Sequence, residues 1–218
     1  LTLNQIHFFT ALGNDDYGDK CFKILSSMGI KLHVAWRDKP TRRGFSLIDY
    51  QGERAITVIG ERLAPNYKDN LDWNILKKMD GVFITASDSE IFKMARSASI
   101  LCTTPRAGLN TINKSNVLLD GLIGSNLDPG EVFSFSELSV KPKYTIKTEG
   151  EKGGIIFPGG RYEALKNNEL KIDSYGCGDS FAAGILYGMT SKWDIDKSLN
   201  LAKVMGREAS EFFGPYAN

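Results

Sequence analysis

The hydrophobic and polar positions of the first forty residues follow first a strand pattern, then a helix pattern, then a strand pattern again. Residues 6–12 form a continuous apolar run that is typical of a buried strand. Residues 17–28 carry apolar side chains at helical spacing, Gly29 is a helix stop signal, and residues 30–36 form a second strand-like run. This order predicts a βαβ unit, because two parallel strands need a crossover connection.

The pattern changes between residues 44 and 59. Two β-rich arms, residues 45–49 and 55–59, flank a polar connection of residues 50–54 that contains glycine. We therefore predict a β-hairpin over 44–59. A hairpin within an alternating α/β chain is expected at an edge or projecting outward.

Regular alternation of strand and helix patterns resumes after residue 70, and a strand pair and two helices follow late in the chain. The alternation predicts a mostly parallel sheet covered by helices on both faces, which makes the expected fold class a three-layer αβα sandwich in a single domain over residues 1–218. The predicted elements are helices at 71–79, 89–98, from about Gly178, and at 195–213, with strands at 81–85, 100–103, 116–123, 144–148 and 154–157.

Composition narrows the class of protein. The 218 residues are 42% apolar and carry a formal charge of +1, so no global field favours nucleic acid or an anionic membrane, and small molecules are the expected partners. No apolar run approaches the length needed to cross a bilayer. Cys21, Cys102 and Cys177 are widely spaced and accompanied by only two histidines, which fits neither a disulfide framework nor a zinc cluster and predicts a reducing, cytoplasmic setting.

The stretch from 173 to 184 carries the strongest chemical signal. Gly176 and Gly178 precede Asp179 in a Gly-x-Gly-Asp turn that opens into an apolar helix. Glycines let a ligand approach the backbone, and the first N–H groups of a helix bind anions. A carboxylate beside them can accept a proton from a hydroxyl that attacks a phosphoryl group. An Asp that only caps the helix is the alternative interpretation.

Residues 173–184 resemble the C-terminal signature of the ribokinase-like, or PfkB carbohydrate kinase, family, written Asp-Thr-x-Gly-Ala-Gly-Asp-Ser/Thr-Phe. Ser174 stands in place of Thr and Cys177 in place of Ala. The resemblance implies that Asp179 is the catalytic base and that Gly176, Cys177 and Gly178 form the anion hole. It also implies a monovalent cation such as K+ near Asp173 and Ser174.

Other segments extend the resemblance from about residue 8 to residue 214. Residues 11–18 resemble a strand-turn-helix of the family, 52–54 its hairpin turn, and 147–153 its nucleotide loop. The resemblance implies an ATP site, with Thr148, Gly150 and Gly153 in the nucleotide loop and Lys203 and Gly206 near the adenine. An ordinary turn between strands is the alternative for residues 148–153.

Two departures from the family pattern affect the expected site. The magnesium-associated Asn-x-x-Glu motif is absent after residue 123, and its nearest counterparts are Asp128 and Glu131, which could act on Mg²⁺ through water or belong to a simple turn. The first strand of the family, with a substrate-binding Asp, and part of its lid have no counterpart. We therefore expect an N-terminal strand and part of the lid to be absent.

The hairpin at 44–59 corresponds by resemblance to a lid over the substrate, and its outer face could pair with a second copy of the chain. Arg43 enters the hairpin and Arg106 follows a strand end, so both are candidate substrate contacts. A solvated surface is the alternative for Arg43. Trp36, Trp73 and Trp193 are assigned to the core, His7 and His33 to structural roles, and Cys177 to a reactive thiol at a helix start.

The sequence thus predicts a kinase that uses ATP and Mg²⁺ to phosphorylate a hydroxymethyl group of a sugar or nucleoside-like substrate. The alternative is a catalytically impaired protein that binds nucleotides or metabolites and regulates others on a kinase scaffold. A flavodoxin-like or Rossmann module is disfavoured because the glycine motif lies near the C-terminus and not after the first strand.

Overall fold

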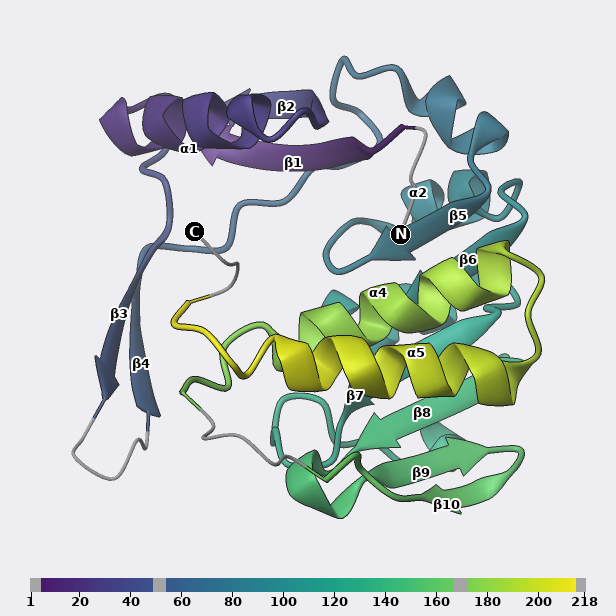
Figure 1. The fold of residues 1–218 in the computed structure, drawn as a ribbon. Helices are drawn as coiled ribbons and strands as arrows, with labels where there is room; N and C mark the ends of the chain where they lie inside the picture. Colours follow the sequence, from purple (N-terminus) through teal and green to yellow (C-terminus); the bar gives the residue numbers. More distant parts are fainter. Residues whose placement is uncertain (1–4, 49–53, 167–171, 215–218) are drawn as a thin grey trace. The chain divides into compact units, whose positions relative to one another are not determined.

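The computed structural model describes residues 5–48, 54–166 and 172–214. The chain divides into two compact units, residues 1–73 and residues 74–218 (Figure 1). The prediction of a single domain stays a prediction. None of the helices in the described ranges has the length and apolar character of a membrane span.

The first unit contains the predicted βαβ motif and the predicted hairpin (Figure 1). The two longest strands pair in parallel, from His7–Lys31 to Gly13–Arg37, and the hairpin strands pair antiparallel. The tip of the hairpin, including most of the predicted turn at 52–54, lies outside the described residues. The elements are β1 (His7–Gly13), α1 (Asp16–Ser27), β2 (Lys31–Arg37), β3 (Arg43–Ile48) and β4 (Arg54–Ile59).

Asp15 organises the start of α1. Its carboxylate caps the helix by accepting the N–H of Gly18, and it also accepts the N–H and the hydroxyl of Thr41, at 2.8 and 2.6 Å. The hydroxyl of Thr41, followed by its N–H and that of Gly18, lowers the pKa of Asp15. The side chain thereby ties the helix to the segment that leads into β3.

Both histidines of the chain lie side by side on β1 and β2. The Nδ1 atom of His7 lies 2.9 Å from Nε2 of His33, and the His33 ring stacks on Phe9 at 4.2 Å between centroids. Phe9 in turn stacks on Trp73, which is buried. The predicted structural role of the histidines fits these contacts. The assignment of Trp36 to the core is wrong, because that side chain is 43% exposed and borders only Phe22 among the described rings.

The second unit is built around a six-stranded sheet of order β10-β9-β8-β7-β6-β5. Strands β5 to β8 are parallel, and β9 and β10 are antiparallel additions at one edge. The order of strands that the sequence predicted for this unit is confirmed, and β10 is an additional strand. The strands are β5 (Gly81–Ile84), β6 (Ile100–Thr103), β7 (Gly121–Ser125), β8 (Tyr144–Thr148), β9 (Gly154–Phe157) and β10 (Gly160–Tyr162).

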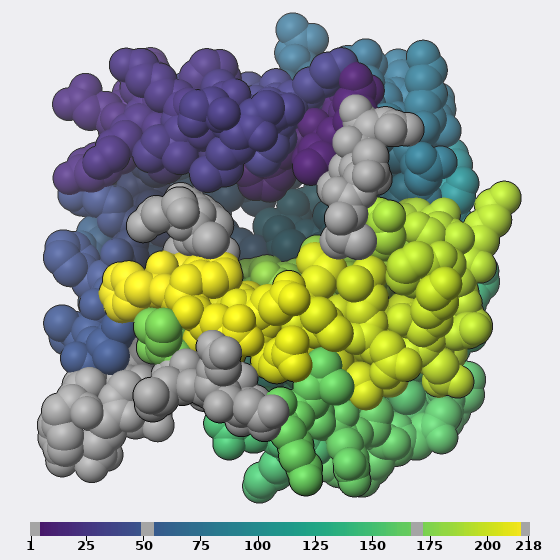
Figure 2. Space-filling view, viewed as in Figure 1, coloured from purple at the N-terminus to yellow at the C-terminus, as the bar shows by residue number. Residues whose placement is uncertain are grey.

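Helices cover both faces of this sheet, as predicted. In Figure 1, α4 and α5 lie in front of the strands and α2 lies behind them. The space-filling view shows the yellow surface of α5 directly beside the yellow-green surface of α4 (Figure 2). The helices are α2 (Ser89–Ala95), α3 (Leu109–Ser115), α4 (Cys177–Thr190) and α5 (Ile195–Glu208), with 3-10 turns η1 (Trp73–Lys78), η2 (Pro105–Ala107), η3 (Phe135–Glu137) and η4 (Gly150–Lys152).

Close packing of α4 on α5 depends on glycine. A Cβ atom at Gly184 would lie 2.6 Å from Cα of Ala202, so only glycine fits at this crossing. Ile146, Ile185 and Ala202 are fully buried in the core between the helices and the sheet. The helix starts are thus held against the sheet by a well-packed interior.

Several elements differ from the sequence prediction. The helix predicted at 71–79 is the 3-10 turn η1, and the helix predicted at 89–98 ends at Ala95. The strand predicted from residue 116 begins at Gly121, because Asn116 adopts a left-handed conformation that ends α3. The last helix ends at Glu208 and not at residue 213.

Candidate nucleotide-binding site

The start of α4 carries backbone N–H groups that no side chain caps, although the N–H of Cys177 lies 3.4 Å from the carbonyl oxygen of Ser174 and donates to it. Gly176 adopts φ +86°, which L side chains rarely allow, and no side chain caps the helix. A Cβ at Gly178 would meet no atom within 4 Å, so the first turn faces open space. The N–H groups of a first helical turn have no intrahelical acceptor, and the helix dipole adds partial positive charge there. The arrangement is suited to an anion.

The segment before α4 is fastened to the end of α5. The backbone N–H of Ile172 donates to the carbonyl of Ser210 at 2.9 Å, and the carboxylate of Asp173 accepts the N–H groups of Tyr175 and Gly214 at 3.0 Å each. Asp173 is buried and holds the turn in place. Its proposed proximity to a monovalent cation, with Ser174, stays a prediction.

A second wall is formed by the connection between β8 and β9. Gly150 and Gly153 adopt φ +59° and +82°, and a Cβ at Gly153 would lie 2.8 Å from the N atom of Ala164. Glycine is therefore required for this loop to pass under the segment that follows β10. The loop backbone remains open to a ligand on its other side.

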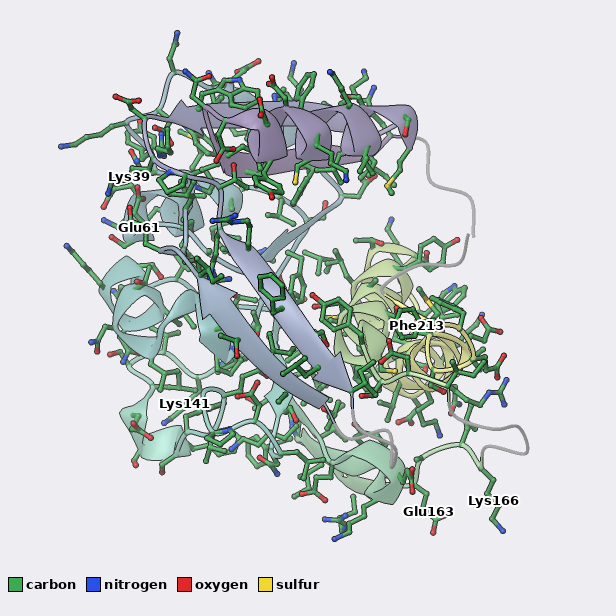
Figure 3. The ribbon with its side chains drawn as sticks, turned by 90° about the vertical axis from the view of Figure 1, so that its left-hand side faces the viewer. Lys39, Glu61, Lys141, Glu163, Lys166 and Phe213 are labelled. Carbon is green, nitrogen blue, oxygen red and sulfur yellow. The ribbon has the colours of Figure 1, made fainter. Side chains whose placement is uncertain are left out.

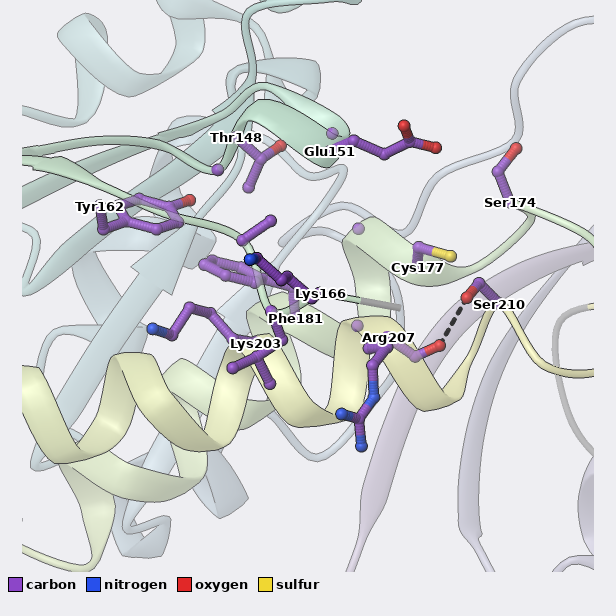
Figure 4. Close-up of a pocket in the computed structure, with 16 residues that line it drawn as sticks. Thr148, Glu151, Tyr162, Lys166, Ser174, Cys177, Phe181, Lys203, Arg207 and Ser210 are labelled. Atoms are coloured by element: carbon purple, nitrogen blue, oxygen red, sulfur yellow. Dashed lines mark hydrogen bonds between the residues drawn. The ribbon is translucent and has the colours of Figure 1, made fainter. Parts of the chain in front are cut away.

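These walls enclose a pocket of about 690 Å³, within the range of small-molecule sites. Tyr162 and Lys203 lie toward one end, and Cys177 and Ser174 toward the other (Figure 4). The lining residues are Thr148, Gly150, Glu151, Gly153, Tyr162, Ala164, Leu165, Lys166, Ser174, Cys177, Gly178, Phe181, Lys203, Gly206, Arg207 and Ser210.

The structure brings together most of the residues that the sequence singled out for nucleotide and anion binding. Thr148, Gly150, Gly153, Lys203 and Gly206 all line the pocket with Cys177 and Gly178. Asp179 is exposed on the first turn of α4, next to Gly178, and does not itself line the pocket. Its role as a base stays a prediction.

Aromatic and basic side chains complete the pocket and were not identified from the sequence. Tyr162 stacks on Phe181 at 6.1 Å between centroids, and desolvation raises the pKa of its hydroxyl. Arg207 and Lys166 add basic side chains to the pocket lining (Figure 4), and Figure 3 shows the side chain of Lys166 extending away from the ribbon. Phe181 belongs to the glycine signature itself and could have been found there. Tyr162 lies on the three-residue strand β10, which is too short for its pattern to be read.

The remaining predicted site residues have other partners in the structure. The guanidinium of Arg43 lies over the ring of Tyr17, 5.0 Å from its centroid. Arg106 forms ion pairs with Asp128 and Glu131, the two residues proposed for magnesium. In this conformation the two carboxylates do not fit a magnesium ion, because a guanidinium already occupies them.

The second unit therefore combines a mostly parallel α/β sheet with a glycine-rich anion cradle at a helix start, and with the first unit it makes up a ribokinase-like fold. The adenosine kinase from Sinorhizobium meliloti has a TM-score of 0.76 at 16% identity, with 98% of this chain and 74% of that chain covered. The ribokinase from Thermotoga maritima has a TM-score of 0.70 at 20% identity, covering 95% and 75%.

An uncharacterized sugar kinase from Pyrococcus horikoshii, solved in complex with ATP, has a TM-score of 0.71 at 18% identity, with 97% of this chain and 78% of that chain covered. No family model and no curated protein matches the sequence. At these identities the likeness establishes the fold. The likeness by itself does not define an activity, because one fold supports many functions.

Proposed function

We propose that this protein is an ATP-dependent kinase that transfers the γ-phosphoryl group to a hydroxymethyl group of a sugar or nucleoside-like substrate. One observation carries the proposal. Residues at the start of α4 and in the glycine loop between β8 and β9 line the same pocket of about 690 Å³. A phosphate chain and a nucleoside need such a combination of an anion cradle with a partly apolar cavity.

The lining residues suggest how ATP would lie. The phosphates are assigned to the end with Cys177 and Gly178, because the N-terminus of α4 lies there. The adenine ring of ATP is assigned to the end with Tyr162, Phe181 and Lys203, because stacked aromatic rings offer apolar area to a flat ligand. The proteins of known structure that share this fold are named adenosine kinase, ribokinase and sugar kinase, and the sugar kinase was solved in complex with ATP.

Asp179 is the proposed base. It follows Gly178 on the first helical turn and is exposed, so a substrate hydroxyl can reach it from solvent. The carboxylate would accept the hydroxyl proton while the neighbouring amides stabilise the charge on the transferring phosphoryl group. Mg²⁺ bound to the phosphates of ATP would supply further charge neutralisation.

The test is Asp179→Asn. Turnover should fall by about a hundred- to ten-thousandfold, the usual contribution of a general base, while ATP affinity measured by calorimetry stays close to that of the wild type. Asp196→Asn is the matched control, because Asp196 is exposed on the first turn of α5 and does not line the pocket. An Asp179→Asn variant with wild-type turnover would rule out the assigned base.

A nucleotide-binding regulator without kinase activity is the second candidate function. The observation that favours it is the engagement of Asp128 and Glu131 by Arg106, at the place where the sequence predicted magnesium ligands. Screening wild-type protein against sugars and nucleosides with an ADP-release assay separates the two candidates. ATP binding with no product from any acceptor would favour the regulator.

A further inference from the structure

Arg106 links two segments at the ends of neighbouring strands. It lies in η2, directly after β6, and its guanidinium reaches the loop that follows β7. Its Nε donates to Oε1 of Glu131 at 2.6 Å, and its Nη2 donates to the carboxylate of Asp128. One fixed positive charge is therefore shared by the two acidic side chains of this loop.

Glu131 is fixed on its other side as well. Its Oε2 accepts the backbone N–H of Ser125 at 2.7 Å, and its side chain is only 10% exposed. A Cβ at Gly124 would lie 2.9 Å from this oxygen and 2.8 Å from Cδ of Pro105. The absence of a side chain at Gly124 therefore leaves room for the carboxylate of Glu131. Both oxygens of this carboxylate accept hydrogen bonds, one from Arg106 and one from the backbone N–H of Ser125.

The same loop is joined to the nucleotide loop. The backbone N–H of Asn126 donates to the carbonyl of Thr148, and its side-chain amide donates to Oε1 of Glu149, both at 2.9 Å. Arg161 donates to Oε2 of Glu149 at 2.7 Å. The hydrogen bond from Asn126, followed by that from Arg161, lowers the pKa of Glu149, which keeps this carboxylate charged. These polar contacts, together with the peptide bond between Ser125 and Asn126, therefore connect Arg106 to Thr148 in the pocket wall.

The position occupied by Arg106 is a poor place for a divalent ion. A guanidinium keeps its charge at any physiological pH, and Mg²⁺ requires oxygen ligands in strict octahedral geometry. Within 5–48, 54–166 and 172–214, no group of three or more acidic, histidine or cysteine side chains is arranged to hold a metal.

We propose that Arg106 serves as the protein's own counter-charge for the loop at 125–131, and that it is a positioning residue for the nucleotide loop. Magnesium then reaches the site only with the nucleotide and has no ligand in Asp128 or Glu131. The positioning part rests on the proposed nucleotide-binding function. The charge part does not, because it concerns the protein without nucleotide.

Binding of Mn²⁺ to the nucleotide-free protein, followed by electron paramagnetic resonance, tests the charge part. Wild type and Glu131→Gln should bind Mn²⁺ equally weakly. Arg106→Gln should bind it at least about tenfold more tightly, because removal of the positive charge leaves two carboxylates to attract a cation. The gain should vanish in the Arg106→Gln, Glu131→Gln double variant, and Arg106→Lys should resemble the wild type.

Wild-type protein that binds Mn²⁺ more tightly than Glu131→Gln would overturn the proposal, and this comparison does not require Arg106→Gln to fold. A folded Arg106→Gln variant without a gain in Mn²⁺ affinity would overturn it equally.

Nucleotide affinity tests the positioning part. Calorimetry should show weaker ATP binding by Arg106→Gln, with a raised KM for ATP and a smaller change in kcat, and Arg106→Lys should restore most of the affinity. Equal affinities for ATP in the wild type and Arg106→Gln would overturn this part. If the wild type bound no ATP at all, the proposed function would fail, whereas the Mn²⁺ result would still stand or fall by itself.

Discussion

Asp120 is the most thoroughly satisfied buried acid among the described residues. Its carboxylate, 1% exposed, accepts from Arg96, Lys143 and the backbone N–H of Leu101 at 2.6 to 2.8 Å. Burial raises the pKa of Asp120, but the hydrogen bonds from Lys143, Leu101 and Arg96 outweigh it, so the pKa is lowered. The residue joins β6 and the starts of β7 and β8.

We expect Asp120→Asn to destabilise the protein by about 2 kcal/mol. The estimate is below the 3–5 kcal/mol typical of a broken buried pair, because Arg96 and Lys143 remain 28% and 56% exposed and can be hydrated. Urea unfolding of the variant measures the loss. Asp38→Asn, at an exposed acid, is the control, and equal stabilities of the two variants would contradict the assigned role.

Cysteine reactivity gives a second prediction at the residue scale. Burial raises the pKa of Cys102 to about 12, so this thiol should resist alkylation, whereas Cys177 lines the pocket. In a Cys21→Ser background, iodoacetamide should modify Cys177 first, and ATP should slow the reaction. Peptide mass spectrometry identifies the modified residue. Modification of Cys102 before Cys177, or no modification of Cys177, would contradict this expectation.

At the scale of elements, sequence patterns located most of the strands and most of the helices. The hairpin, the βαβ motif and the helix after the glycine signature were predicted because their periodicity is regular over many residues. Helix α3 was missed, since Leu109–Ser115 is rich in Asn, Thr and Ser, which favour turns. The pairing of Arg106 with Asp128 and Glu131 was also missed, because residues 22 to 25 positions apart meet only through the sheet.

The histidine pair makes the β1–β2 element sensitive to pH. Burial, followed by the proximity of His7 and Lys31, lowers the pKa of His33, and Asp72 opposes this in part. The unfolded chain therefore binds the proton more readily than the folded one. The contribution of His33 to stability should be full above about pH 6.5, the ordinary histidine value, and should decrease as the pH falls below it toward the lowered pKa of the folded chain.

Urea unfolding at pH 8 and pH 5.5 measures this difference, and NMR can follow both histidine rings. His33→Gln should lose less stability on acidification than the wild type does. An NMR titration in which His33 took up its proton at or above the ordinary value would contradict the prediction.

The crossing of α4 and α5 should be intolerant of added volume. Gly184→Ala places a methyl group 2.6 Å from Cα of Ala202, and overpacking of this kind costs about 1–3 kcal/mol. Gly178→Ala, in the same helix but with open space around its Cβ, is the matched control. Thermal unfolding compares them, and a Gly184→Ala variant as stable as Gly178→Ala would show that the helices can separate.

For the whole molecule, ATP should protect particular segments from hydrogen exchange. We expect slower exchange in residues 148–153, 174–181 and 203–207, because these segments line the pocket. Residues 109–115 of α3 lie outside the pocket lining and serve as the internal reference. Mass spectrometry with and without ATP measures the change. Equal protection of the reference and the pocket segments would contradict the site.

The glycine crossing of α4 and α5 has a further consequence for ligand binding. Since the helices meet without intervening side chains at Gly184, the amide groups at the start of α4 acquire their orientation when the chain folds. Their loss of conformational entropy then belongs to folding and is not repeated when a phosphate arrives. Such preorganisation allows a site built largely from backbone groups to select its ligand by charge and shape.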